Sequence, residues 1–469
     1  MFKKFFWRGL LTLLLLVLCG LILFITANLR DQELRPEVQA ALQWQGPKTV
    51  DDENGFLILL GMNANASVDP LMLGKQRLAA EIQRYQKDRF LPYLENQLEF
   101  SASHEAAFDY QKSDLCDFVV TPNCVAFYLS RPVRQEQEIL RSQQIMLQQF
   151  ERILAKQIYV EIIPPHITAN LPTYGVLMHA AELKRMQALR LLADGQTAQG
   201  LSVLLTVARF SQRWLAGSSH IISHMVALAS LQRDLRILDE ALQRFPQLLE
   251  HEAQFQDYLG HFSEERMYLD RALQFESQVG LQLMQSMVST QAEPQSDWKQ
   301  GLIMKLLHRP NAALNLTYDW HALWRSIALR GSRQYDLAHA ALGAQQRALL
   351  GFGMGNVYLR DPISKILLTL STPGFETFFE KNIDILAHLK LFSLKLAILN
   401  QVTSNHGIAN VDVAQFIQAH SALYANPYDG KPIAWDPVQQ LLFIDVRQSS
   451  NQVYQKSTRL TLSLSSTRH

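Results

Sequence analysis

The strongest hydrophobic signal lies at the start of the chain. From Gly9 to Leu29 the sequence carries no charged residue. As a helix rising ~1.5 Å per residue, this run spans about 31 Å, which is the thickness of a bilayer's hydrocarbon core. No comparable run follows. We therefore expect one transmembrane anchor carrying a large water-soluble body.

Charges around this run predict its direction. Lys3, Lys4 and Arg8 precede it, whereas a mixed, slightly acidic flank follows. The positive-inside bias places the N-terminus in the cytoplasm and the body on the periplasmic side of a bacterial inner membrane. The run is long for a signal peptide, and its exit around Ala27 offers no A-x-A-like cleavage site. An uncleaved, single-pass anchor is expected.

Helical spacing of apolar residues dominates the rest of the chain and predicts a mainly α fold. The secondary structure of the segment that begins at Glu53 is not decided by the pattern, because a short apolar run between turn residues fits a strand or a buried helix. The expected divisions are a cytoplasmic tip and anchor (1–30), a stalk (31–52), an N-terminal helical unit with a disulfide loop (53–165), a body of stacked α-hairpins (166–400) and a C-terminal segment with a small β-hairpin (401–469).

Residues 173–262 give the clearest pattern in the body. Helical runs rich in Ala and Leu end at short turns, the first of them at Asp194-Gly195. This arrangement predicts stacked antiparallel helix hairpins, of which the first pair looks like a tetratricopeptide-type unit. The 34-residue period of that repeat does not recur cleanly, so we expect irregular α-hairpins.

The C-terminal segment changes character. In NPYDGKPIAWDP, turn dipeptides punctuate short apolar runs, which favours a small β-hairpin that closes the body. Pro427, Gly430 and Pro432 are expected to form the terminal turn. The last twenty residues are rich in Ser, Thr and Gln and alternate weakly. They fit either an edge strand or a frayed tail.

Two of the three cysteines are spaced to form a disulfide. Cys19 lies in the anchor, whereas Cys116 and Cys124 bound the nine-residue segment CDFVVTPNC. A short loop of this kind suits a disulfide in an oxidising compartment, which the anchor independently predicts. The alternative is two unrelated buried thiols. Neither a His nor a Cys cluster supports a zinc site there.

Composition narrows the range of partners. Hydrophobic residues make up 48% of the chain, charged residues 19%, and the net charge is +1. This balance predicts neither nucleic acid nor an anionic membrane surface as a partner. The expected partners are the lipid bilayer, through the anchor, and an envelope protein.

Candidate metal-binding, nucleotide-binding and catalytic motifs in the sequence are all incomplete. His220 and His224 are spaced to share a helix face, but the Glu of a metalloprotease helix is absent between them, and we interpret them as a polar shoulder. The glycines of residues 351–355 fit neither phosphate-binding nor dinucleotide spacing and predict a flexible loop. Acidic pairs such as Asp239-Glu240 are expected on solvated helix faces. No metal, cofactor or catalytic residue is predicted.

Several segments carry a resemblance. The opening ENGFLILLG…DP…G, the short Cys pair, RPNAALN, DPISKILL and NPYDGKPIAWDP resemble an uncharacterised family of proteobacterial membrane-anchored envelope proteins, over most of the chain. The resemblance implies an anchored periplasmic protein and brings no activity. The terminal DG-x-P segment also looks like the β-ending of some type II pseudopilins, although the Gly-Asp-rich calcium-loop tail of those proteins is missing.

These observations favour a non-catalytic periplasmic scaffold or adaptor of the cell envelope. One alternative is a periplasmic hydrolase that acts on cell wall or peptide, with a site assembled from residues distant in sequence. Another is an accessory component of a secretion or pilus-like system. A deep polar pocket would favour the hydrolase, and a shallow apolar surface would favour the adaptor.

Overall fold

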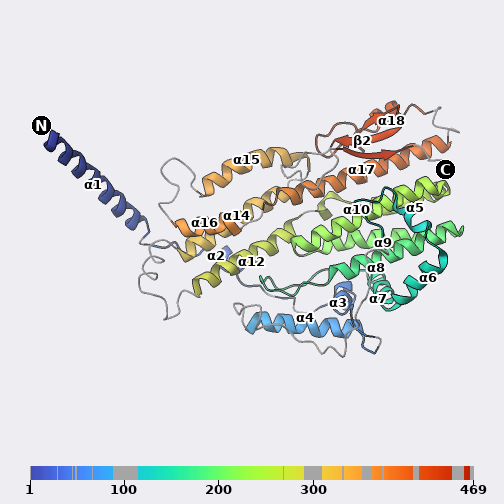
Figure 1. The fold of residues 1–469 in the computed structure, drawn as a ribbon, viewed down its shortest axis with the longest axis horizontal. Coiled ribbons are helices and arrows are strands. Elements are labelled where there is room, and N and C mark those ends of the chain that lie inside the picture. The colour runs from blue at the N-terminus through green and yellow to red at the C-terminus, as the bar shows by residue number, and fades with distance from the viewer. Residues whose placement is uncertain are drawn as a thin grey trace.

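The fold is an elongated stack of helices with one apolar helix projecting from its end (Figure 1). The computed structural model describes residues 2–28, 30–44, 46–47, 50–65, 67–87, 115–267, 269–289, 309–329, 332–350, 361–371, 374–404, 411–445 and 459–464. The glycine-rich loop expected at 351–355 lies outside these residues.

Helices form most of the described chain, as the apolar spacing predicts. The first half contains α1 (Phe2–Ala27), α2 (Pro36–Ala41), α3 (Gly55–Leu60), α4 (Pro70–Lys87), α5 (Cys124–Leu129), α6 (Val133–Ser142), α7 (Gln144–Ala155), α8 (Tyr174–Ala193), α9 (Thr197–Gly217) and α10 (Ile221–Arg244). The second half contains α11 (Glu252–Gly260), α12 (Asp270–Ser289), α14 (Pro310–Ala328), α15 (Ser332–Leu350), α16 (Pro362–Ser371), α17 (Glu376–Ser404) and α18 (Val413–Ala419). Short 3₁₀ helices cover Pro246–His251 and Glu264–Met267.

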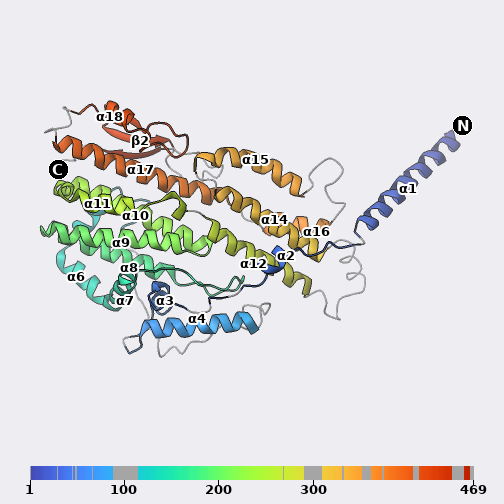
Figure 2. The same ribbon diagram turned by 180° about the vertical axis from the view of Figure 1, so that it is seen from behind.

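Helix α1 is long and apolar enough to cross a membrane. Its apolar part, Phe6–Thr26, has none of its surface buried against the body. Figures 1 and 2 show it extending away from the helical stack, whereas α5 and α6 lie at the opposite end. The body therefore has an end near the anchor and an end remote from it.

Three antiparallel helices form the centre of the stack. Helix α9 packs against both α8 and α10, and Gly195 makes the turn after α8 with a φ of +79°. The expected Asp-Gly stop is thus confirmed, because glycine enters this left-handed region without a steric penalty. The leucines that fill the interfaces include Leu183, Leu189, Leu201, Leu205, Leu231 and Leu235.

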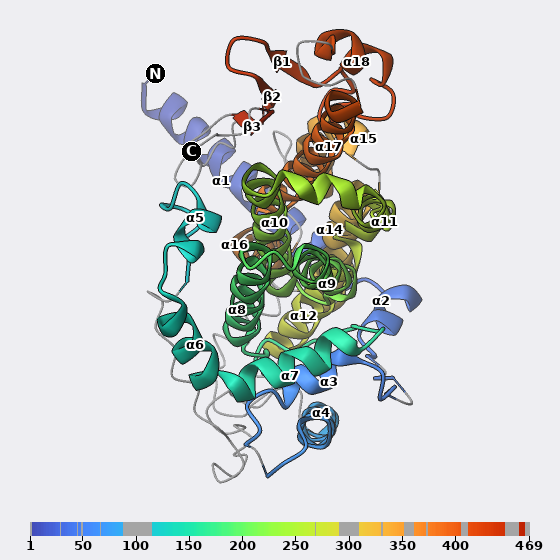
Figure 3. The same ribbon diagram turned by 90° about the vertical axis from the view of Figure 1, so that its right-hand side faces the viewer.

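Outer elements cover this centre on two sides. Helix α17 packs on α10, and a three-stranded sheet packs on α17; α7, α3 and α4 lie on the opposite side (Figure 3). The segment that begins at Glu53, which by its pattern fits a strand or a buried helix, forms the helix α3. Its contact with α4 depends on Gly61 and Gly74, because a Cβ on either would overlap main-chain atoms of the other helix or its N-terminus. Both glycines belong to the ENGFLILLG…DP…G pattern.

The C-terminal segment forms antiparallel strands. Strand β2 (Leu441–Asp445) pairs with both β1 (Ala434–Asp436) and β3 (Arg459–Ser463). The expected hairpin is therefore present, and the closing residues add an edge strand. In the preceding turn Gly430 has a φ of +72°, and Pro432 bridges back to Ala425, with Pro427 between them.

The segment directly after α1 is bound to the body. The Asp31 carboxylate accepts hydrogen bonds from the main-chain N–H groups of Asn311 (2.9 Å) and Ala312 (3.1 Å), which lie in the first turn of α14. The first four main-chain N–H groups of a helix have no hydrogen-bond partner within that helix. A carboxylate can bind them, and its charge also suits the positive end of the helix dipole. Asn28 accepts a hydrogen bond from the main-chain N–H of Asp361, just before α16.

Residues 34–42 extend this attachment. Arg35 binds the main-chain oxygen of Asn315 and the carboxylate of Asp319, both on α14. Val38 of α2 is fully buried. Its small apolar cluster also contains Leu42, Leu281, Met284, Ala313 and Leu314. Much of the segment expected as a stalk thus lies against the body; RPNAALN (309–315) supplies part of its binding surface, and DPISKILL (361–368) contacts Asn28 just before it.

Candidate functional site

A buried carboxylate marks the most polar site in the interior. Glu161 lies in the irregular connector between α7 and α8 (residues 156–173) and is 2% exposed. Its carboxylate accepts hydrogen bonds from Tyr174 (3.0 Å), from Tyr159 (3.3 Å), from the N–H and hydroxyl of Ser219, and from the hydroxyl of Ser223. These donors satisfy both oxygens, as a buried charged group requires.

His220 extends the network. Its Nδ1 accepts from the N–H of Ser223 at the start of α10. The ring proton therefore lies on Nε2, which is 2.9 Å from the Tyr174 hydroxyl and donates to it. Tyr174 in turn donates to Glu161. Burial lowers the pKa of His220 to about 4, and burial raises the pKa of Glu161 above its ordinary value. The imidazole is neutral at pH 7.

A cavity of about 450 Å³ adjoins this carboxyl group. Its walls come from the segment after α2, from the connector around Glu161, from the turn between α9 and α10, and from one face of α12. The lining residues are Gln43, Trp44, Pro47, Val160, Glu161, Ile162, Ile163, Ser219, Arg271, Gln274, Phe275 and Gln278. Arg271 contacts the connector, since its Nη2 donates to the main-chain oxygen of Glu161 at 2.8 Å.

A glycine sets the position of the connector. Gly217 ends α9, and its main-chain oxygen accepts from the N–H of Glu161 at 3.0 Å. A Cβ at Gly217 would fall inside the van der Waals radius of the Tyr159 main-chain oxygen. The close approach of α9 to the connector therefore requires glycine.

His220 and His224 have separate partners. His224 Nε2 contacts the side-chain oxygen of Asn382 on α17 (2.9 Å), and its Nδ1 contacts the hydroxyl of Ser218 (3.1 Å). Both imidazoles are buried. The interpretation of this pair as a polar shoulder is therefore wrong, because the start of α10 is covered by α12 and α17. Within the described ranges, no cluster of three or more His, Cys, Asp or Glu residues could hold a metal ion.

The burial of His224 predicts a pH effect. Burial lowers its pKa to about 4, so the unfolded chain, with a histidine pKa of ~6.5, binds the proton more readily. Stability should fall as the pH drops from about 6.5 toward 4. In His224→Gln this contribution disappears. The difference in unfolding free energy between wild type and variant should change by about 2 kcal/mol between pH 7.5 and 5.0. Denaturant titrations at both pH values measure it, and parallel pH dependences would contradict the assignment.

A second buried network joins α8 to α10. The Arg185 side chain is fully buried; its Nε lies 2.7 Å from Asp234, and its Nη1 lies 2.9 Å from Glu182. Its Nη2 donates to the hydroxyl of Ser230 (3.0 Å). The Tyr128 hydroxyl donates to Glu182 and accepts from the N–H of Cys116, which connects this network to the disulfide loop.

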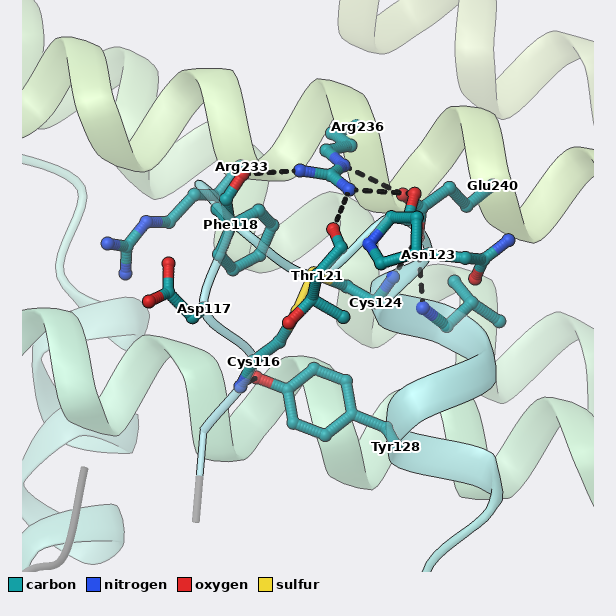
Figure 4. Close-up of a disulfide and its surroundings, with 12 residues drawn as sticks. Cys116, Asp117, Phe118, Thr121, Asn123, Cys124, Tyr128, Arg233, Arg236 and Glu240 are labelled. Atoms are coloured by element: carbon teal, nitrogen blue, oxygen red, sulfur yellow. Dashed lines mark hydrogen bonds and ion pairs between the residues drawn. A yellow bond between two sulfur atoms is a disulfide. The ribbon is translucent and has the colours of Figure 1, made fainter. Parts of the chain in front are cut away.

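Cys116 and Cys124 form the predicted disulfide (Figure 4). The loop between them is held from outside as well. Arg236 of α10 donates to the main-chain oxygens of Phe118 (2.6 Å) and Thr121 (2.6 Å). The Glu240 carboxylate accepts from the N–H groups of Cys124 (2.7 Å) and Val125 (2.9 Å), in the first turn of α5.

The loop nevertheless exposes two apolar side chains. Val119 is 81% exposed and Val120 is 69% exposed. The guanidinium groups of Arg233 and Arg236 lie over the ring of the preceding Phe118, at 4.9 and 5.5 Å from its centroid. The main chain is thus fixed on both sides of the valines, while the valines face solvent.

Asp239-Glu240 was expected on a solvated face, and this expectation is wrong. The two residues are 6% and 7% exposed. Asp239 forms a buried ion pair with Lys395 of α17 (2.5 Å), and Glu240 binds the first turn of α5. The two residues do lie on a charged face of α10, but α17 and the disulfide loop cover this face.

Removing the disulfide should lower stability measurably. A nine-residue loop closed by a disulfide contributes about 2.5 kcal/mol in the chain-entropy treatment. The double variant Cys116→Ser/Cys124→Ser should therefore melt about 3 °C below wild type, given the size of the body. Thermal unfolding followed by circular dichroism measures the shift. Cys19→Ser, which changes the exposed free thiol of the anchor, should leave the melting temperature unchanged.

No family model, curated protein or solved structure matches this chain. Sequence reasoning noticed His220 but missed Glu161 and Arg271, because neither stands in a recognisable motif. The EIIPPHITANLP break was the available signal: its two prolines end the helical pattern and make an irregular segment that can place Glu161 among donors from α8, α10 and the α9–α10 turn.

Proposed function

We propose that this chain is a non-catalytic scaffold or adaptor of the bacterial cell envelope, anchored in the inner membrane by α1 with its body on the periplasmic side. The observation that carries the proposal is the pair of exposed valines on the disulfide loop. This loop precedes α5, at the end of the body remote from the anchor (Figure 1). A fixed apolar protrusion buries surface on binding without a large loss of conformational entropy.

The attachment of α1 supports the same role. Asp31 and Arg35 bind α14, so the body is not suspended on a free linker. An adaptor joined to its anchor in this way presents the disulfide loop at a defined distance from the membrane. The segments that carry the resemblance to membrane-anchored envelope proteins, RPNAALN and DPISKILL, lie at this attachment, which is consistent with that family.

Photo-crosslinking in intact cells tests the proposal. A photoreactive amino acid at position 119 in the full-length protein should give a discrete adduct, whose partner is identified by mass spectrometry. Position 134 on α6 is the control, because Arg134 is 92% exposed at the same end of the body. Val120→Asp should abolish the adduct without unfolding the exposed loop. The same background of adducts at 119 and 134 would overturn the adaptor proposal.

A hydrolase acting on cell wall or peptide is the second candidate, and the cavity beside Glu161 favours it. The carboxylate already accepts from Tyr159, Tyr174, Ser219 and Ser223, so it is held as a structural acceptor and has no vacant position from which to act as a base. Turnover of cell-wall fragments that is lost in Glu161→Gln would reverse this ranking. Partners from a secretion or pilus-like system would place the adaptor in that machinery.

A further inference from the structure

The cavity beside Glu161 has the size and the lining of a small-molecule site. Its volume of about 450 Å³ lies in the range of ligand pockets, and its walls come from four separate segments. Among the lining residues Arg271 is the one permanent cation, and Glu161 is the one acid. The balance of these two charges decides which ligands the cavity accepts.

Arg271 is available to an anion. It lies partly buried on α12 and donates one hydrogen bond to the main-chain oxygen of Glu161. Within the described part of the chain, its guanidinium has no carboxylate within 4.0 Å. The Glu161 carboxylate accepts from the serines and tyrosines instead, so its oxygens are directed at these donors and not at the guanidinium. The cavity is therefore biased toward negative ligands.

The remaining walls add hydrogen bonding and apolar contact. Gln274 and Gln278 follow Arg271 at i+3 and i+7, so the three side chains share one face of α12. Phe275 and Trp44 also line the cavity, and the Trp44 indole lies edge-on to Tyr85 at 5.2 Å between ring centroids. Amides bind amide and hydroxyl groups of a ligand, and aromatic rings cover its apolar parts.

We propose that this cavity binds a small ligand that carries a carboxylate together with amide or hydroxyl groups. The carboxylate pairs with the Arg271 guanidinium, which presents a planar fork matched to carboxylate geometry. Gln274 and Gln278 bind the neutral polar groups, and Trp44 and Phe275 cover the carbon skeleton. Such a carboxylate can come from an acidic sugar or from the end of a short peptide.

Two matched pairs of probes distinguish these sources in calorimetric titrations of the full-length protein in detergent. The sugar pair is N-acetylmuramic acid and N-acetylglucosamine, which lacks the lactate carboxylate. The peptide pair is acetyl-alanyl-alanine and its C-terminal amide. The acid of one pair should bind at least tenfold more tightly than its neutral counterpart, because only the acid pairs with Arg271. The pair that shows the preference identifies the source.

Variants test the role of Arg271. Arg271→Gln should weaken binding of the preferred acid at least tenfold, whereas the exposed control Arg134→Gln should not change it. Gln274→Glu, at an exposed position of α12, should also weaken binding, because it places an internal carboxylate beside the guanidinium. This second variant keeps the test valid if Arg271→Gln does not fold. Equal binding of acid and neutral probes, no binding of any probe up to about 10 mM, or unchanged binding by both variants would overturn the proposal.

Discussion

Replacing Arg185 with methionine should lower the free energy of unfolding by about 4 kcal/mol, the largest effect expected from a single substitution in this chain. Methionine fills a similar volume but carries no charge. It leaves Asp234 buried between α8 and α10 without its cation, whereas Glu182 keeps its ion pair with Arg233. Burying an unpaired carboxylate is far more costly than losing the favourable pair itself.

Denaturant unfolding of the full-length protein in detergent measures this effect. Arg134→Met is the matched control, because Arg134 is exposed and pairs with Glu138 on the surface of α6; it should change stability by less than about 0.5 kcal/mol. Adding Asp234→Leu to Arg185→Met should recover part of the loss, since the carboxylate that lost its cation is then removed. A loss below about 1 kcal/mol for Arg185→Met would show that water or rearranged side chains satisfy the carboxylates.

Replacing Gly217 with alanine should destabilise the protein by about 3 kcal/mol. The new methyl group would overlap the main-chain oxygen of Tyr159, so the connector that carries Glu161 would have to move. In an ordinary helix the same change stabilises, because alanine has the higher helix propensity. The sign of the effect is therefore diagnostic of the close approach.

Gly260→Ala provides the comparison for this substitution. Gly260 ends α11, and within the described residues no atom other than those of its chain neighbours and its own helix backbone lies within 4 Å of the position that its Cβ would occupy. We expect a melting temperature equal to or slightly above that of wild type for Gly260→Ala, and one lowered by several degrees for Gly217→Ala. Equal melting temperatures for the two variants would contradict the packing of α9 against the connector.

Local patterns in the sequence predicted the elements well. The apolar run gave α1, the Asp-Gly stop gave the turn at Gly195, and the nine-residue Cys segment gave the disulfide. Each of these features depends on residues close together in the chain. The short run after Glu53 remains ambiguous because five consecutive apolar residues fit a strand and a buried helix equally.

The site depended on contacts that no local pattern reveals. Glu161 receives its donors from residues up to 62 positions away, and Asp239 pairs with Lys395, 156 positions away. On α10 alone, Asp239-Glu240 resembles any charged helix face, because a buried ion pair and a solvated one have the same composition. Burial is decided by tertiary packing, which helical periodicity does not specify.

The attachment of Asp31 to α14 has a consequence for biosynthesis. Asp31 is translated near the beginning, but its partner Asn311 follows 280 residues later. At roughly 5–20 residues per second, the ribosome needs about 14–56 s to produce the second half of this contact. Throughout that interval the nascent chain contains the completed α1, but the residues of α14 that bind Asp31 have not been made. This contact beside the anchor can therefore form only after residue 311 has been made, although it involves some of the first residues of the chain.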